Sequence, residues 1–223
     1  SKKAKNAEGG GERYYHGIVS QLVSNGSRTA DVDEQKNYID YQATIVPFAA
    51  SMRNRKNSRI FQKKTIKDIF ADLFGQHNVA FSDKTSKNYP KYEYCVQYQE
   101  SDFDFIQRLL QSEGIFYFFE HTKSNHTLVL ADDITAYEMC GEAKVVHSTG
   151  HLSESHVSRW QGGLSLAPGS FKRLGYDFKQ PSRYPDAEQA NAELPTQSVS
   201  EIFEYTAESE CHPRAANLAS VQL

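Results

Sequence analysis

The clearest alternation of apolar and polar residues lies within residues 92–133, the segment around which the chain is organised. Four apolar or aromatic positions alternate with polar ones, namely Tyr92, Tyr94, Val96 and Tyr98. A period of two is typical of a strand with one buried face. Cys95 lies on the other face, where its ordinary role is that of a small buried apolar group. The pattern predicts a strand that stops at Ser101.

A short amphipathic helix is predicted directly after this strand. The Ser101 hydroxyl can accept a hydrogen bond from a backbone N–H of the first turn, Asp104 completes a capping box, and Asp102 is favoured by the helix dipole. Gly114 is the expected left-handed residue at the helix end. The apolar stripe that should pack on the strands comprises Phe103, Ile106, Leu109 and Leu110.

Glu113 falls on the apolar side of this helix, where a carboxylate is unfavourable unless it is paired. Two interpretations remain open. Either the helix unwinds before Gly114, so that Glu113 turns out to a backbone N–H or a cation, or Glu113 forms an ion pair at an interface. Residues 115–120 (IFYFFE) are apolar on both faces and predict a central strand. A polar turn at 122–125 then leads to a returning strand at 127–131.

The first half of the chain predicts two strands and a second helix. Residues 13–23 and 38–46 have strand patterns, and polar residues 24–37 predict an exposed hairpin connection. Thr65 and Asp68 form a second capping box, and the helix should end at Gly75. Its apolar stripe comprises Ile66, Ile69, Phe70 and Leu73. Two further segments lack an apolar pattern: residues 1–12 predict a flexible arm and residues 81–91 a loop.

Beyond residue 133 the pattern changes to short strands separated by turn residues. These strands are predicted at 144–147, 156–160, 171–178 and 200–206. Residues 180–198 contain three prolines and predict a long surface crossing. The pattern of this half is typical of a barrel or a sandwich.

Composition narrows the classes of function. The 223 residues carry 25 basic and 28 acidic side chains, so a net charge of -3 provides no field that would attract nucleic acid. The three cysteines lack CxxC spacing, which indicates a reducing compartment rather than a disulfide framework or a zinc knuckle. No stretch reaches the length of a membrane span, and the first twelve residues lack the apolar core of a signal peptide.

Candidate chemistry is sparse. His121 and His126 flank the hairpin turn and Asp132 and Asp133 follow the returning strand, so a metal site can be imagined. Without a third convergent ligand these residues are better explained as polar strand ends, and we expect no metal or cofactor. No nucleophile, phosphate-binding or zinc-protease motif is present, and we expect a protein that is not an enzyme. The alternative is a carboxylate-dependent hydrolase that uses Asp102, Asp132 or Asp133, if these groups converge in a pocket.

Residues 94–121 read YCVQYQESDFDFIQRLLQSEGIFYFFEH, and residues 126–133 read HTLVLADD. These two runs resemble the signature region of the VgrG family, the spike proteins of bacterial type VI secretion systems. Residues 13–20 and 58–74 resemble upstream family segments, and 176–178 and 203–205 resemble downstream strands. The structural motif carried by this resemblance comprises Ser101, Asp102, Phe103, Asp104, Phe105, Glu113 and Gly114.

The resemblance implies an α+β, mostly β fold with two related β-barrel domains and packed short helices, similar to contractile phage tail-hub proteins. It implies a first barrel at 1–62, a unit of helices and aromatic strands at 63–133, second-barrel strands at 134–206, and a linker toward an OB-fold and needle at 207–223. The chain begins almost at the RYYHGIVS segment, so we expect an incomplete first barrel and weak self-association of this fragment.

The implied function is that of a structural hub in a trimeric spike, which caps the hexameric secretion tube and helps to puncture target membranes for effector delivery. Homotrimerisation of the full-length protein is expected, with the tube protein and the baseplate and tip proteins as partners, and with no nucleic acid and no stable membrane insertion by this fragment. The protein would be made in the bacterial cytoplasm and exported through the type VI apparatus without a signal peptide. A phage-type tail baseplate hub is an alternative.

Overall fold

A computed structural model describes residues 2–4, 13–29, 37–138, 146–150, 156–163, 168–176, 181–182, 186–190 and 200–206. The chain divides into two compact units. The first comprises residues 1–107, 117–146 and 151–156, and the second comprises 108–116, 147–150 and 157–223. The boundary passes through one helix, and each unit is described by itself.

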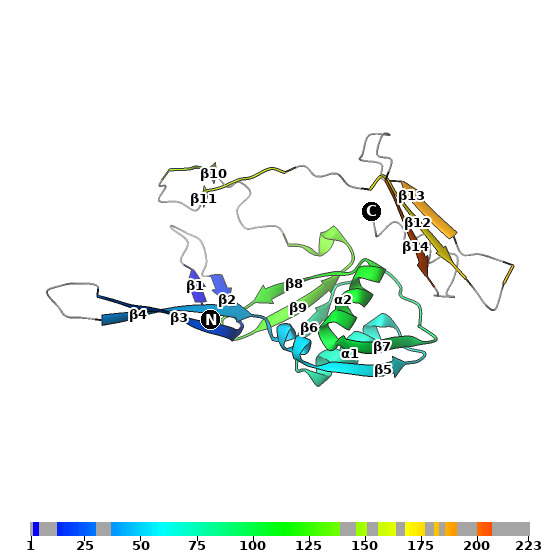
Figure 1. Ribbon diagram of the computed structural model, residues 1–223, viewed down its shortest axis with the longest axis horizontal. Coiled ribbons are helices and arrows are strands. Elements are labelled where there is room, and N and C mark those ends of the chain that lie inside the picture. Colours follow the sequence, from blue (N-terminus) through cyan, green and yellow to red (C-terminus); the bar gives the residue numbers. More distant parts are fainter. Residues whose placement is uncertain are drawn as a thin grey trace. The chain divides into compact units, whose positions relative to one another are not determined.

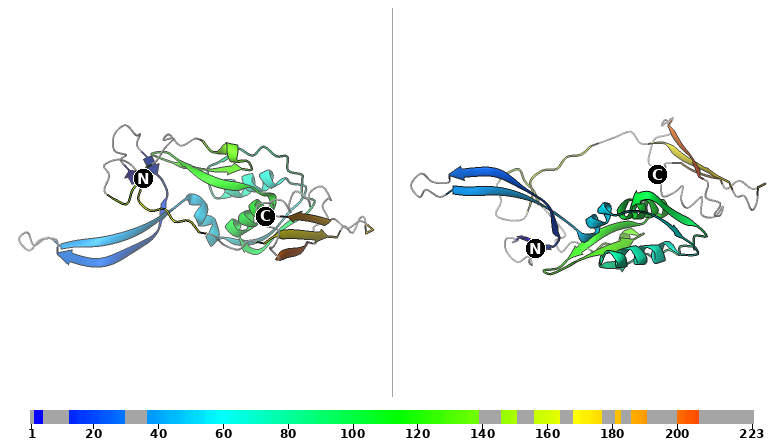
Figure 2. Two further views of the ribbon diagram at one scale, coloured as in Figure 1. Left: turned by 90° about the horizontal axis from the view of Figure 1, so that it is seen from above. Right: turned by 60° about the horizontal axis from the view of Figure 1, so that its bottom comes forward.

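A long two-stranded ribbon is the most extended part of the first unit. Strands β3 (Ile18–Thr29) and β4 (Asn37–Val46) pair antiparallel, and several views show them reaching away from the rest of this unit (Figures 1 and 2). The predicted exposed connection at 24–37 is therefore wrong for its first part, since β3 continues to Thr29. Pro47 follows β4 directly and ends the strand, because proline cannot donate to the ladder.

The predicted single strand at 13–23 is interrupted. Strand β2 (Arg13–Tyr15) pairs antiparallel with β1 (Lys2–Ala4), and β3 begins only after His16 and Gly17. A Cβ at Gly17 would lie 2.6 Å from the Val46 carbonyl oxygen, so the chain can turn into the ribbon here only with glycine. The predicted flexible arm at 1–12 is wrong for residues 2–4, which form β1, and its other residues lie outside the described part of the chain.

The core of the first unit begins with a 3₁₀ segment, η1 (Phe48–Asn54), strand β5 (Lys56–Phe61) and helix α1 (Ile66–Gln76). Both bonds of the predicted Thr65 and Asp68 capping box are present. The predicted apolar stripe of α1 is buried. The helix does not end at Gly75 but continues to Gln76, because a glycine within a helix lowers its stability without forcing it to stop.

Strand β7 (Cys95–Ser101) pairs antiparallel with β5 and leads directly into helix α2 (Asp102–Glu113). The alternation predicts a strand from Tyr92 that ends at Ser101, but β7 begins only at Cys95, and of the three predicted inward tyrosines only Tyr92 is buried. Cys95 and Gln97 are buried, whereas Tyr94 and Tyr98 are exposed, since a tyrosine-rich face need not be the buried one. Phe105 lies outside the predicted stripe, yet it is fully buried and stacks on Phe61.

A three-stranded sheet completes the first unit, in the order β6-β9-β8, with bounds β6 (Phe81–Asp83), β8 (Phe116–His121) and β9 (His126–Ala131). The apolar run at 115–120 predicts a central strand, but β8 is an edge strand and β9 is central. The predicted loop at 81–91 is wrong at its start, where β6 pairs parallel with β9. A short 3₁₀ turn, η2 (Ile134–Ala136), follows β9.

The second unit contains a three-stranded sheet in the order β13-β12-β14, with bounds β12 (Ser170–Gly175), β13 (Asp186–Ala190) and β14 (Glu201–Thr206). Strand β13 lies within residues 180–198, so the predicted surface crossing is wrong there. Strands β10 (Val146–His147) and β11 (His156–Val157) form a separate pair, and β11 is shorter than the predicted strand at 156–160. The predicted strand residues 144–145 and 177–178 and the predicted linker at 207–223 lie outside the described part.

The fold is mostly β with few helices. Each sheet among the described residues contains two or three strands, so no closed barrel is seen within that part of the chain. No helix in the described segments is long and apolar enough to span a bilayer. The first unit contains the three features that matter for a functional site: a helix-capping junction, a histidine cluster and a projecting ribbon.

Candidate functional site

The predicted motif at 101–104 forms the junction between strand β7 and helix α2. The Ser101 hydroxyl oxygen accepts a hydrogen bond from the Asp104 N–H at 3.0 Å. The same hydroxyl donates to Asp104 Oδ2 at 2.6 Å. These bonds account for Ser101 and Asp104 as capping residues.

Asp102 has a role beyond its favourable interaction with the helix dipole. Its carboxylate is fully buried and bound by several protein groups. Arg59 from β5 forms an ion pair with it, the Gln97 side-chain amide donates to it at 2.8 Å, and His77 Nε2 lies 2.7 Å from it. Burial by itself would raise the pKa of Asp102, but the bonds from Gln97, His77 and Arg59 hold that pKa below its usual value. The carboxylate therefore joins both strands and the end of α1 to the start of α2.

The other candidate carboxylates also hold protein groups. Asp132 accepts hydrogen bonds from the backbone N–H groups of Ser86 and Lys87, both at 2.8 Å, and from the Tyr89 hydroxyl at 2.8 Å. Burial opposes ionisation, but these donors outweigh it and lower the pKa of Asp132 to about 2. Asp133 accepts from the Thr135 N–H at the start of η2. Asp132 therefore holds the loop that follows β6, and Asp133 holds the turn that follows β9.

The remaining motif residues lie along α2. Phe103 is half-buried beneath the Arg53 guanidinium, whose carbon is 4.5 Å from the ring centre. Gly114 has the predicted positive φ of 67°. Glu113 is the last helical residue and is buried, so the interpretation in which the helix unwinds before it is wrong.

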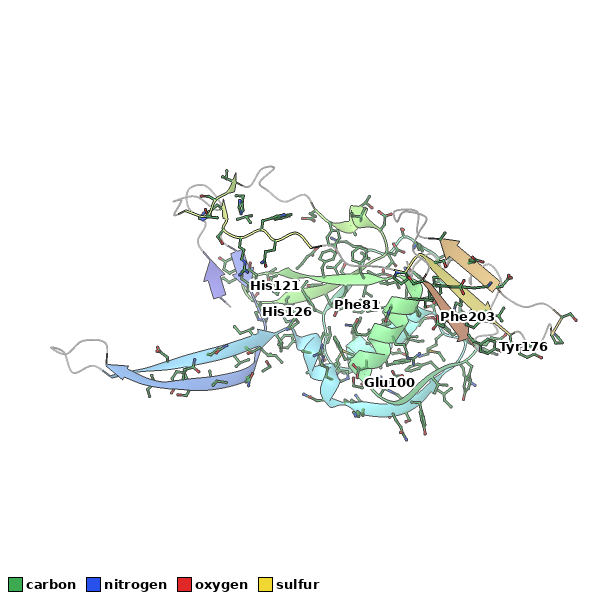
Figure 3. All side chains as sticks on the ribbon, turned by 45° about the horizontal axis from the view of Figure 1, so that its top comes forward. Phe81, Glu100, His121, His126, Tyr176 and Phe203 are labelled. Carbon is green, nitrogen blue, oxygen red and sulfur yellow. The ribbon has the colours of Figure 1, made fainter. Side chains whose placement is uncertain are left out.

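His121 and His126 do come together, joined by a third histidine that the sequence pattern did not single out. Figure 3 shows His121 and His126 at the end of the β8–β9 hairpin. His16, which interrupts the strand pattern more than a hundred residues earlier, places its Nδ1 2.9 Å from His126 Nδ1. Its own backbone N–H donates to His121 Nδ1 at 3.2 Å. In the part of the chain that the structure describes, no group of three or more His, Cys, Asp or Glu side chains has metal-binding geometry.

The ribbon carries most of its large apolar side chains on one face, while Val23, which pairs with Gln42, lies on the other. Along β4 this face comprises Ile39, Tyr41, Ala43 and Ile45, and on β3 Val19 pairs with Ile45 and Leu22 with Ala43. Val19 and Leu22 are three positions apart, and a bulge at Ser20 brings them to the same side. The apolar face is exposed, with 47% to 63% of each large side chain accessible for Val19, Leu22, Ile39, Tyr41 and Ile45.

Exposed aromatic side chains also occur elsewhere. In the first unit, Tyr94 and Tyr98 lie on or beside the outer face of β7, with Ile60 of β5. In the second unit, Phe203 and Tyr205 lie on one face of the edge strand β14. Large exposed aromatic and aliphatic groups of this kind mark protein contact surfaces.

The described residues thus form a mostly β protein whose small sheets expose apolar and aromatic side chains. The sequence profile of the phage tail baseplate hub (GPD) family matches residues 3–223, and the chain belongs to this family. The chain is also similar in sequence to VgrG spike proteins of type VI secretion systems. The VgrG1c and VgrG1a spike proteins of Pseudomonas aeruginosa are each 36% identical to it, over 178 and 180 residues and 78% of this chain.

The relatives are much longer than the matched region. The chain spans 24% of VgrG1c and 27% of VgrG1a, so it corresponds to about a quarter of each. The actin cross-linking toxin VgrG1 of Vibrio cholerae is 33% identical over 181 residues, which are 74% of this chain and 15% of that protein.

Solved structures support the fold. The 43 kDa tail protein of prophage MuSo2 from Shewanella oneidensis aligns over 99% of this chain and 61% of its own, with a TM-score of 0.58 and 12% identity. The E. coli c3393 protein is described as a type VI secretion component similar to the T4 tail proteins gp27 and gp5. It aligns over 60% of this chain and 36% of its own, with a TM-score of 0.51 and 23% identity.

Proposed function

We propose that this chain is the hub portion of a type VI secretion spike, a part that works by rigid assembly and transmission of force rather than by turnover. The observation that carries the proposal is the exposed apolar face of the β3–β4 ribbon, in a chain of the baseplate hub family. A two-stranded ribbon has little stability of its own in water, so a one-sided apolar face needs a partner surface.

We propose that the first partners of this face are two further copies of the chain. Three copies in a closed heterologous ring would leave no such face uncovered. If each copy also presents two related barrels, a threefold ring can match the sixfold symmetry of the secretion tube. The baseplate and tip proteins would complete the contacts, and the protein would leave the cell through the type VI apparatus.

A non-enzymatic role is supported by the positions of the candidate carboxylates. Asp102, Asp132 and Asp133 each accept hydrogen bonds from protein groups, which gives all three a structural use. A phage-type tail hub remains the second candidate, favoured by the alignment with the MuSo2 tail protein along almost the whole chain. The two candidates share the same assembly mechanics and differ in the partner structure.

Sedimentation velocity tests the assembly. We expect the 223-residue chain to be monomeric or weakly associating at micromolar concentration, and a longer chain that includes the OB-fold and needle regions to be trimeric. Stable contacts should each bury at least about 1,000 Å², with Tyr and aliphatic side chains contributing more than Lys.

Two ribbon variants of the longer chain provide a matched comparison. Leu22→Glu places a charge on the apolar face and should shift the trimer toward monomers by at least tenfold in the association constant. Gln42→Glu places the same charge on the opposite face of the ribbon and should leave the association unchanged. A longer chain that stays monomeric or forms a dimer would contradict the hub model.

A further inference from the structure

The three histidines lie where both strands of the ribbon join the rest of the first unit. His16 precedes β3 by two residues, and Phe48 follows β4 by two residues. His121 is the last residue of β8 and His126 the first of β9. Contacts among these four residues therefore tie both ends of the ribbon to the β8–β9 hairpin.

The hydrogen bonds assign the proton positions in this cluster. The Phe48 N–H donates to His126 Nε2 at 3.0 Å, so that nitrogen carries no proton and the neutral ring must carry it on Nδ1. His126 Nδ1–H then donates to His16 Nδ1 at 2.9 Å. The His16 N–H donates to His121 Nδ1. Each ring thus accepts one hydrogen bond at an unprotonated nitrogen.

An added proton would remove one of these bonds wherever it is taken up. On His126 Nε2 it would oppose the Phe48 N–H, and on His121 Nδ1 it would oppose the His16 N–H. On His16 Nδ1 it would face the His126 Nδ1–H, with two donors 2.9 Å apart. A positive charge would also repel the neighbouring rings if they were charged, since the His126 ring centre lies 5.2 Å from that of His16 and 5.8 Å from that of His121.

The surroundings of the cluster provide no compensating charge among the described residues. Phe48 and Phe119 pack against His126, and Tyr15 of β2 packs against His121 at 5.9 Å. The nearest acidic residue in sequence, Glu120, is paired with Lys84 at 2.9 Å. Burial first, and then His16 and His121, lower the pKa of His126 below its usual 6.5.

We propose that His16, His121 and His126 form a pH-dependent clamp, which fixes the base of the β3–β4 ribbon at neutral pH and releases it when the cluster takes up a proton. The inference concerns the first unit alone and does not depend on the hub role. The direction follows from linkage. The closed clamp binds fewer protons than the open one, so its stability is fully present above about pH 6.5 and falls as the pH drops below that value.

Nuclear magnetic resonance of the 223-residue chain provides a direct test. Imidazole nitrogen shifts at pH 7.5 should place the proton of His126 on Nδ1 and those of His16 and His121 on Nε2. Between pH 7.5 and 5 the backbone amides of His16 and Phe48 should lose at least tenfold in hydrogen-exchange protection, corrected for intrinsic rates. The heteronuclear NOE of Leu22 in the ribbon should fall over the same range, while the amides of α1 keep their protection.

Two variants separate the clamp from general acid sensitivity. His126→Gln keeps an acceptor and a donor but cannot titrate, so the loss of protection at low pH should disappear at the Phe48 amide, which donates to residue 126. His147→Gln changes an exposed histidine of β10 and should retain the response of the unmodified chain. The proposal is overturned if protection at His16 and Phe48 does not change, if α1 loses protection in parallel, or if the Phe48 amide keeps its response in His126→Gln. If His126→Gln fails to fold, a His126 proton on Nε2 at pH 7.5 in the unmodified chain would overturn it equally.

Discussion

Asp102 joins strands β5 and β7 and the end of helix α1 to the first turn of α2. Replacing it with Asn would leave the Arg59 guanidinium, only 19% exposed, without its counter-charge. Breaking a buried pair is far more costly than breaking an exposed one. We therefore expect Asp102→Asn to lower the free energy of unfolding by about 3 kcal/mol.

A matched control for this prediction is Asp72→Asn, since the pair of Asp72 with Lys64 is about 40% exposed on both sides. It should cost less than about 1 kcal/mol. Urea denaturation of both variants measures the difference. Equal midpoints would show that Asp102 is not the joining residue that the hydrogen bonds indicate.

The low pKa of Asp132 predicts that the stability of the folded chain is sensitive to acid. Its folded pKa of about 2 lies below the ordinary value of 3.8, so its contribution is fully present above pH 3.8 and is lost as the pH falls from there toward 2. The total contribution is about 2 kcal/mol by linkage. The stability difference between the unmodified chain and Asp132→Asn should therefore shrink between pH 5 and 3, as followed by urea midpoints. A difference that stays constant would contradict this assignment.

At the scale of elements, both ends of α2 are specified by single residues. Ser101→Ala removes the cap and should cost about 1 kcal/mol. Gly114→Val forces a β-branched residue to a φ of 67° and should cost more, about 2 kcal/mol. Gly75→Ala is the control, because that helical glycine has no atom within 4 Å of the added Cβ and the change should stabilise α1 by roughly 0.5 to 1 kcal/mol. Neutral stability of Ser101→Ala together with a changed activity would refute the capping role.

The elements that the sequence predicted are those with local causes. The Thr65 and Asp68 capping box and the apolar stripe of α1 depend on neighbours within one or two helical turns, and both were predicted. Strand faces depend on what packs against them, which is why Tyr94 and Tyr98 proved to be exposed. The apolar strand β8 lies at the edge of its sheet for a similar reason. Its place depends on how β9 pairs with β6 and β8, and not on the sequence of β8 alone.

The candidate site residues also divide into those with local contacts, which were predicted, and those with long-range contacts, which were not. Ser101 and Asp104 cap the helix as their spacing indicated. His16 was missed, because its contact with His126 joins residues 110 positions apart and no local pattern records such a contact. The break in the strand pattern at His16 and Gly17 was the one available signal. A stretch that alternates well but carries a His-Gly pair can end one strand and start another.

At the scale of the whole molecule, each unit exposes apolar or aromatic groups on a sheet with two or three strands. The first unit has the ribbon, and the second has β14 with Phe203 and Tyr205 at its edge. Sheets this small gain little from their own packing, and their exposed faces are where further protein can add area. Stability of these parts should therefore depend on protein concentration and partners more than that of the α1 core.

The bulge at Ser20 acts as a phase shift in the alternation of side chains. Side chains on a regular strand change sides at every residue, so Val19 and Leu22 would lie on opposite sides and the ribbon would have two mixed faces. One extra residue, with its hydroxyl bonded to the Thr44 carbonyl, restores the phase and places Val19 and Leu22 on the same side as Ala43 and Ile45 of β4. The same sequence paired without the bulge would form a more regular ladder and yet lose the asymmetry that makes the ribbon a surface.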